Sequence, residues 1–167
     1  AAQVRHLDAD VIQLDEANLP GHPGEWKWAA ETINKVLKAV PKKAKAAVHL
    51  CFGNYGGQSI QKGTWGQLMK YLNALHVDHI VMECAHRPAE ELAVFKDLRP
   101  EIGMGLGVVD IKRTEIESAE AVARAGDQRV EIGKRAEDRV DVAIVADVVA
   151  HVLHRAFEKG REPDRIH

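Results

Sequence analysis

The sequence predicts an α/β fold in which a parallel β-sheet is covered by helices. Short, nearly continuous apolar runs alternate with amphipathic stretches of helical spacing, and segments rich in Gly and Pro separate them. This strand–loop–helix unit recurs about every thirty residues, which is the size of a βαβ unit. Strands that are apolar on both faces are typical of parallel sheets with helices outside them. At 167 residues, the chain is long enough for one domain with a hydrophobic core.

The strands of this fold are predicted at four apolar runs, each followed by a loop segment. These runs are DVIQLD (10–15), AKAAVHLCF (44–52), HIVMEC (79–84) and IGMGLGVVDI (102–111). Four helices are predicted by apolar residues spaced three and four apart, over 26–40, 64–75, 87–98 and from 116 to 125. Pro41 ends the first helix, whereas Thr64 and Ser118 are of the residue types that cap helix N-termini.

The composition changes beyond Gly126, where Arg, Asp, Val and His become frequent. We therefore divide the chain into a β/α domain at 1–125 and a divergent C-terminal tail at 126–167. The valine-rich stretch at 140–149 fits a buried strand or the start of a helix equally well.

Composition excludes several classes of partner. The net charge of −2 gives no reason to expect nucleic acid or an anionic membrane. No apolar run approaches the roughly 20 residues of a membrane span. Two cysteines far apart in the sequence do not indicate a disulfide framework, so a reducing cytoplasm is the expected location.

Polar residues lie at the carboxyl ends of the predicted strands. In a parallel sheet these strand ends lie side by side at one rim. The polar residues comprise four acids, two cysteines and one histidine: Asp15, Glu16, His49, Cys51, Glu83, Cys84 and Asp110. Alternate residues of a strand share a face, so His49 and Cys51 point the same way. Imidazole, thiolate and carboxylate are the donors that zinc takes, and Glu83 adds the third. A His and a Cys two apart also fit an ordinary buried strand.

Four motifs, in this order, resemble the C-terminal catalytic barrel of cobalamin-independent methionine synthase and its shorter relatives: VIQLDEANLPG, HLCFGN, IVMECAHRPAEELAVFKDL and IGMGLGVVDIKRTEIES. The resemblance covers residues 4–125. It implies a (β/α)₈ TIM barrel, of which this chain supplies a part of about four to five β/α units. It also implies a Zn²⁺ that activates a thiol for alkylation, bound by His49, Cys51 and Glu83.

The resemblance implies further site residues and one difference from the family. Asp15 and Glu16 match the acidic pair that contacts the amino-acid substrate, and Asp110 and Lys112 lie in the motif that serves proton transfer. Folate-dependent members carry His where this chain has Lys112, and lysine at its ordinary pKa is a poor proton donor to a folate nitrogen. The alkyl donor is therefore left open between methylfolate, a corrinoid-linked donor and an epoxide.

The fourth zinc ligand of the family, a Cys in a Pro-Asp-Cys-Gly segment, has no counterpart after Ser118. His86, in the loop after Glu83, is another donor close by in the sequence. We expect a truncation, an altered reading frame or a divergent terminus, and a partial barrel that pairs with a second copy or with its missing half.

These observations predict zinc-dependent methyl or alkyl transfer to a thiol such as homocysteine, in methionine biosynthesis. Three alternatives stay open. The first is a lyase resembling the epoxyalkane–coenzyme M transferases. The second is a truncated, non-catalytic relative with an incomplete zinc site. The third, a barrel resembling uroporphyrinogen decarboxylase, would not need the His–Cys pair.

Overall fold

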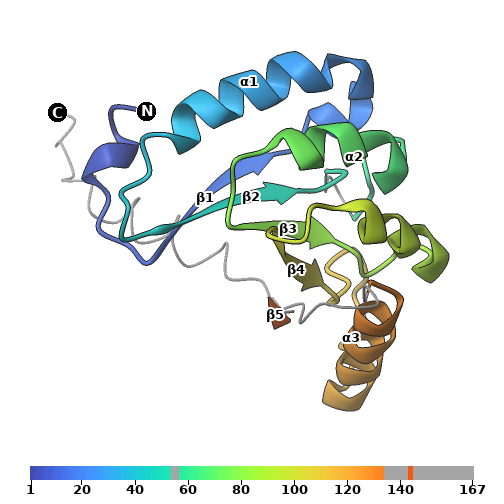
Figure 1. The fold of residues 1–167 in the computed structure, drawn as a ribbon. Helices are drawn as coiled ribbons and strands as arrows, with labels where there is room; N and C mark the ends of the chain where they lie inside the picture. Colours follow the sequence, from blue (N-terminus) through green and yellow to red (C-terminus); the bar gives the residue numbers. More distant parts are fainter. Residues whose placement is uncertain (54–56, 134–142, 145–167) are drawn as a thin grey trace, which may run out of the picture.

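A single parallel sheet with helices beside it organises the computed structural model, which describes residues 1–53, 57–133 and 143–144 (Figure 1). Neighbouring strands are parallel throughout, and they follow one another in sequence order. The strands are β1 (Val11–Glu16), β2 (Lys45–Leu50), β3 (His79–Glu83), β4 (Gly103–Gly107) and β5 (Ala143–Ile144). This arrangement confirms the predicted α/β class and is that of a partial (β/α) barrel.

Helices form the outer layer in the same order as the strands. The longer ones are α1 (Trp26–Leu37), α2 (Trp65–Ala74), η4 (Ala89–Asp97) and α3 (Ala119–Gly133). Short 3-10 turns η1 (Val4–His6), η2 (Leu19–Gly21) and η3 (Pro23–Glu25) lie before α1. Figure 1 shows α1 and α2 on the same side of the sheet, and each longer helix contacts the next along the chain.

Both predicted N-caps are confirmed. Thr64 precedes α2, and its backbone amide donates a 3.1 Å hydrogen bond to the Gln67 side chain in a capping box. Ser118 precedes α3, and its Oγ accepts a 3.2 Å hydrogen bond from the Ala121 amide. The loops before these helices are therefore fixed at the same edge of the sheet as the strand ends.

The helix predicted over 87–98 is a 3-10 helix, η4. A 3-10 helix has about three residues per turn, so residues three apart lie above one another. Leu92, Phe95 and Leu98 have this spacing, and each is at least 98% buried in the hydrophobic core. The tighter winding places all three on the face that packs against the sheet.

On each strand, even-numbered and odd-numbered residues lie on opposite faces of the sheet. Even-numbered strand residues, such as Val48, Ile80 and Leu106, belong to the core formed with the helices. Odd-numbered residues, such as His49 and Glu83, therefore lie on the opposite face, which is the interior face of a barrel. The predicted ligands on the strands share this interior face.

The predicted boundary between residues 125 and 126 stays a prediction. Helix α3 crosses this position and continues to Gly133, and β5 pairs in parallel with β4. The rest of the predicted tail, 134–142 and 145–167, lies outside the described residues. Within the described residues, every helix is too short or too polar to cross a membrane.

Asp78 connects three strands at the amino-terminal edge of the sheet. Its Oδ2 accepts a 2.8 Å hydrogen bond from the Ala46 amide, and its Oδ1 lies 3.1 Å from the Lys45 Nζ. Its carbonyl accepts a 2.9 Å hydrogen bond from the Gly103 amide. Burial alone would raise the pKa of Asp78, but the Ala46 hydrogen bond and the Lys45 and His79 charges outweigh burial and lower it.

Asp78→Ala is expected to lower the free energy of unfolding by about 1 kcal/mol at pH 7, because the Ala46 amide loses its acceptor. A carboxylate with a lowered pKa in the folded state stabilises fully above its unfolded pKa of about 3.9, and this contribution is lost as pH falls through the folded value. Urea unfolding at pH 7, 4 and 3 should therefore show a smaller loss of stability on acidification in the variant. Asp8→Ala, which removes an exposed ion pair with Lys43, is the control and should change little.

Candidate active site

The interior face brings the first two predicted motifs together at the carboxyl ends of the strands. The register of β1 and β2 places Asp15 beside His49. Asp15 Oδ1 lies 3.3 Å from His49 Nδ1 and also accepts a 2.9 Å hydrogen bond from the Gln13 side chain. A carboxylate at Nδ1 fixes the imidazole and directs Nε2 away, which is the usual arrangement behind a metal-binding histidine.

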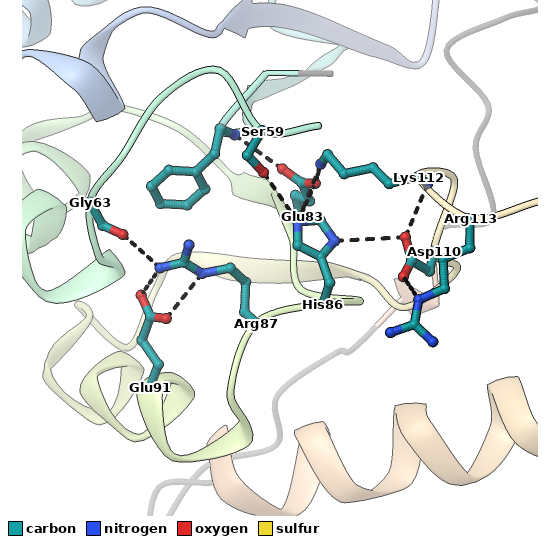
Figure 2. A network of polar contacts seen from close by, with 10 residues as sticks. Ser59, Gly63, Glu83, His86, Arg87, Glu91, Asp110, Lys112 and Arg113 are labelled. Atoms are coloured by element: carbon teal, nitrogen blue, oxygen red, sulfur yellow. Dashed lines mark hydrogen bonds and ion pairs between the residues drawn. The ribbon is translucent and has the colours of Figure 1, made fainter. Parts of the chain in front are cut away.

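Glu83 is the centre of a second cluster of polar contacts (Figure 2). Its Oε2 accepts a 3.0 Å hydrogen bond from the Phe52 amide, directly after Cys51. Its Oε1 lies 3.0 Å from His86 Nε2 and in contact with the Lys112 Nζ. The side chains of Glu83 and Lys112 are only 14% and 8% exposed, so their opposite charges are largely shielded from water.

The loop after β4 aims Lys112 at Glu83. Asp110 Oδ1 accepts a 3.0 Å hydrogen bond from the Lys112 amide, and Asp110 Oδ2 lies 3.2 Å from the Arg113 Nε. The Asp110 amide donates a 2.8 Å hydrogen bond to the Glu117 side chain. On its other side, Asp110 Oδ1 lies 3.8 Å from His86 Nδ1 (Figure 2). Asp110 therefore orients the backbone of the loop and places a carboxylate near the neighbouring imidazole.

Two glycines allow this close packing. Gly107 pairs with Glu83 in the sheet, and a Cβ there would lie 3.0 Å from the Met82 carbonyl oxygen. Gly57 has a φ of +77°, and a Cβ there would lie 3.0 Å from the Lys112 carbonyl oxygen. The glycines in these segments are explained by close backbone approach.

Cys51 lies within electrostatic reach of Lys112. Burial lowers the pKa of the Lys112 ammonium, and the electrostatic influence of the nearby Cys51 acts in the opposite direction. Cys51 is partly buried, whereas Cys84 is fully buried among the core residues on the helix side of the sheet. Neither cysteine forms a disulfide.

Glu16 is the last residue of β1, and its side chain fixes the turn that follows. Its Oε1 accepts hydrogen bonds of 2.7 Å from the Asn18 amide and 2.9 Å from the Leu19 amide. This carboxylate therefore fixes the turn, while the Asp15 side chain stays half exposed at the rim. The predicted role of this acidic pair in substrate binding remains a prediction.

The predicted zinc ligands lie at one rim, but they do not converge on one point. Within the described residues, no three His, Cys, Asp or Glu side chains form a group that could hold a metal ion as they stand. Lys112 contacts Glu83, and Asp15 lies at the Nδ1 side of His49. The donor set itself suits zinc, since it offers imidazole, thiol and carboxylate beside further acids.

Comparison with known proteins identifies the family. The sequence model described as "Cobalamin-independent synthase, Catalytic domain" matches residues 1–143. The chain belongs to this family. The match confirms the resemblance seen in the four motifs, and it extends beyond residue 125.

Several archaeal members of the family named methionine synthase are similar to this chain. The protein of Thermococcus kodakarensis is 34% identical over 117 residues, which are 70% of this chain and 31% of that protein. The protein of Sulfurisphaera tokodaii is 33% identical over 115 residues, which are 69% of this chain and 30% of that protein. The matched region therefore spans less than a third of the length of these relatives.

Arg87 forms a clamp of polar contacts beside the site (Figure 2). The sequence analysis did not predict this clamp. Its guanidinium donates to both carboxylate oxygens of Glu91, at 2.6 and 3.0 Å, and to the Gly63 carbonyl at 2.7 Å. It also lies 4.2 Å from the centroid of the Phe52 ring. The spacing of Arg87 and Glu91, four residues apart in a helical stretch, was the available signal.

Arg87→Lys is expected to lower the free energy of unfolding by about 2 kcal/mol, because an ammonium cannot make the bidentate contact or stack on a ring. Arg87→Ala should cost about 3 kcal/mol or more, since it leaves the partly buried Glu91 carboxylate without its charged partner and with only the Trp65 amide as a donor. Urea unfolding of both variants measures these losses. Equal stability of wild type and Arg87→Lys would contradict the bidentate clamp, and Arg113→Lys is the matched control on an exposed arginine.

Proposed function

We propose that this chain takes part in zinc-dependent transfer of a methyl or alkyl group to a thiol, with homocysteine as the thiol and methionine biosynthesis as the pathway. The supporting observation is the joint placement of His49, Cys51 and Glu83 on the interior face, at the strand ends, in a member of this family. The names of the relatives point to the same chemistry.

In this proposal His49, Cys51 and Glu83 bind Zn²⁺, and Asp15 holds the His49 ring with Nε2 towards the ion. When bound, zinc lowers the pKa of a thiol ligand so that a nucleophilic thiolate forms near neutral pH. Asp15 and Glu16 would also bind polar groups of the amino-acid substrate, the half-exposed Asp15 being the better placed of the two.

Asp110 and Lys112 are proposed to serve the leaving-group side of the reaction. Asp110 fixes the loop from which Lys112 reaches the interior face. Burial lowers the pKa of the Lys112 ammonium, which is the direction that makes it a better proton donor. Whether the donor is a methylfolate, a corrinoid-linked methyl group or an epoxide depends on contacts beyond these residues.

A non-catalytic relative is the second candidate, and one observation favours it. Lys112 neutralises Glu83 in a nearly buried ion pair. If that pair were permanent, Glu83 would be unavailable to a metal, and the chain would be an assembly partner without chemistry of its own.

Zinc content distinguishes the two candidates. The purified chain is expected to hold close to one zinc per chain by elemental analysis, and Cys51→Ser should reduce this to background because a hydroxyl replaces the thiolate ligand. Cys84→Ala is the matched control: it also removes a thiol, but from the helix side of the sheet, and should leave zinc unchanged. A wild-type chain that stays metal-free in excess zinc would decide for the non-catalytic candidate.

A further inference from the structure

The loop between β4 and α3, residues 108–118, has few buried contacts of its own. From Val109 to Ser118, every residue except Asp110 and Lys112 is exposed, and the Ile116 side chain is fully so. Ordering such a segment costs conformational entropy, which exposed side chains do little to offset. The observed position of the loop therefore depends on the contacts of Asp110 and Lys112.

Lys112 anchors the loop to the interior face of the sheet. Its side chain is almost completely buried, and its Nζ contacts Glu83 Oε1 and lies 3.3 Å from His86 Nε2 (Figure 2). At the backbone, a Cβ on Gly57 would lie 3.0 Å from the Lys112 carbonyl oxygen. The loop is thus held against β3 through a side chain and against the segment after β2 through its main chain.

The ion pair inside the loop contributes less to this anchoring. Arg113 Nε lies 3.2 Å from Asp110 Oδ2, but the Arg113 side chain is 73% exposed, and an exposed ion pair stabilises little. Removing one partner of a shielded pair is different, because it leaves the other charge uncompensated away from water. The pair of Lys112 and Glu83 is therefore the main contact that fixes the loop.

The same contact covers part of the candidate site. The Lys112 ammonium lies against one oxygen of Glu83, and the Phe52 amide donates to the other. Cys51 lies within electrostatic reach of the same ammonium. A ligand therefore reaches the Glu83 carboxylate only after Lys112 has moved away from it.

We propose that Lys112 is a latch: its contact with Glu83 holds the loop 108–118 closed over the rim, and release of this ion pair opens the loop and exposes Glu83 and Cys51. This inference goes beyond the proposed function, because it concerns the movement of a loop in the metal-free chain. The two proposals therefore fail on different measurements, the opening of the loop for the latch and the zinc content for the proposed function.

Hydrogen–deuterium exchange followed by mass spectrometry, in buffer that contains a chelator, tests the latch. The amides of Asp110 and Lys112 are hydrogen-bonded to carboxylates of the same loop, so their exchange reports its opening. In Lys112→Met, the peptide 108–118 should exchange about tenfold faster than in wild type, because Glu83 no longer holds the loop. The peptide 65–74, which forms α2, should exchange as in wild type.

Arg113→Met is the matched control for this experiment. It removes a positive charge from the same loop, but from an exposed side chain, and should leave the exchange of 108–118 within about twofold of wild type. Equal acceleration in Lys112→Met and Arg113→Met would overturn the latch, since any loss of charge from the loop would then have the same effect.

Glu83→Gln tests the other half of the ion pair. The amide side chain keeps the volume of Glu83 and an acceptor for the Phe52 amide, so the fold is retained. Exchange of 108–118 should accelerate as it does in Lys112→Met. The double variant should open no further than either single variant, because both residues act through one contact. Additive acceleration would contradict the latch.

Alkylation by iodoacetamide measures access to the rim independently. Cys51 is partly buried beside Lys112, whereas Cys84 is fully buried in the core. In Lys112→Met, Cys51 should be alkylated about tenfold faster than in wild type as the loop opens, although loss of a nearby ammonium alone makes a thiol less reactive. Cys84 should stay unmodified. Faster alkylation of both cysteines would show that the whole core loosens, and would contradict a latch confined to the loop.

Discussion

The alternation of side chains along parallel strands is the constraint on which the rest of this structure depends. Because β1 to β4 run in register and in the same direction, residues of one parity face the helices on every strand. That rule places Cys84 in the core and Glu83 on the interior face, although they are adjacent in the sequence. The arrangement of polar residues at the rim is therefore a consequence of register: a slip by one residue would bury His49 and Glu83 among leucines and expose the core.

Charge balance then determines how the rim is organised. Asp15, Glu83 and Asp110 bring three carboxylates to one edge, and buried or half-buried carboxylates require partners. The chain provides them as the His49 imidazole on β2 and as an imidazole, an ammonium and a guanidinium from the loops after β3 and β4. Since Lys112 is held by Asp110 through its own backbone amide, the cation that neutralises Glu83 is positioned by the next acid along the rim. Removal of a charge from Glu83, Asp110 or Lys112 would therefore be felt by the other two.

Most of the fold could be predicted from the sequence, as could the face of the sheet on which each candidate residue lies. Periodicity identified the strands at β1 to β4 and the helices α1 and α2, because their apolar faces are regular and their caps are local. It did not identify η4 as a 3-10 helix, since i, i+3 spacing also occurs in an α-helix. It also missed the contacts of Arg87 with Gly63 and Phe52 and the contact between Lys112 and Glu83, because these join segments far apart in the sequence. Such contacts depend on how loops fold over a strand end, and no periodic pattern encodes that.

The replacement of a histidine by Lys112 is best understood together with His86. A lysine at this position brings a positive charge to Glu83, the proposed ligand, which by itself would weaken a cation site. Yet an imidazole is still present beside Asp110, because His86 enters from the loop after β3 and lies against the same carboxylate. The rim thus retains an acid–imidazole pair and gains an ammonium. That ammonium is held on the interior face by the contact of its own backbone amide with Asp110, where the proposed reaction would need a proton donor for the leaving group.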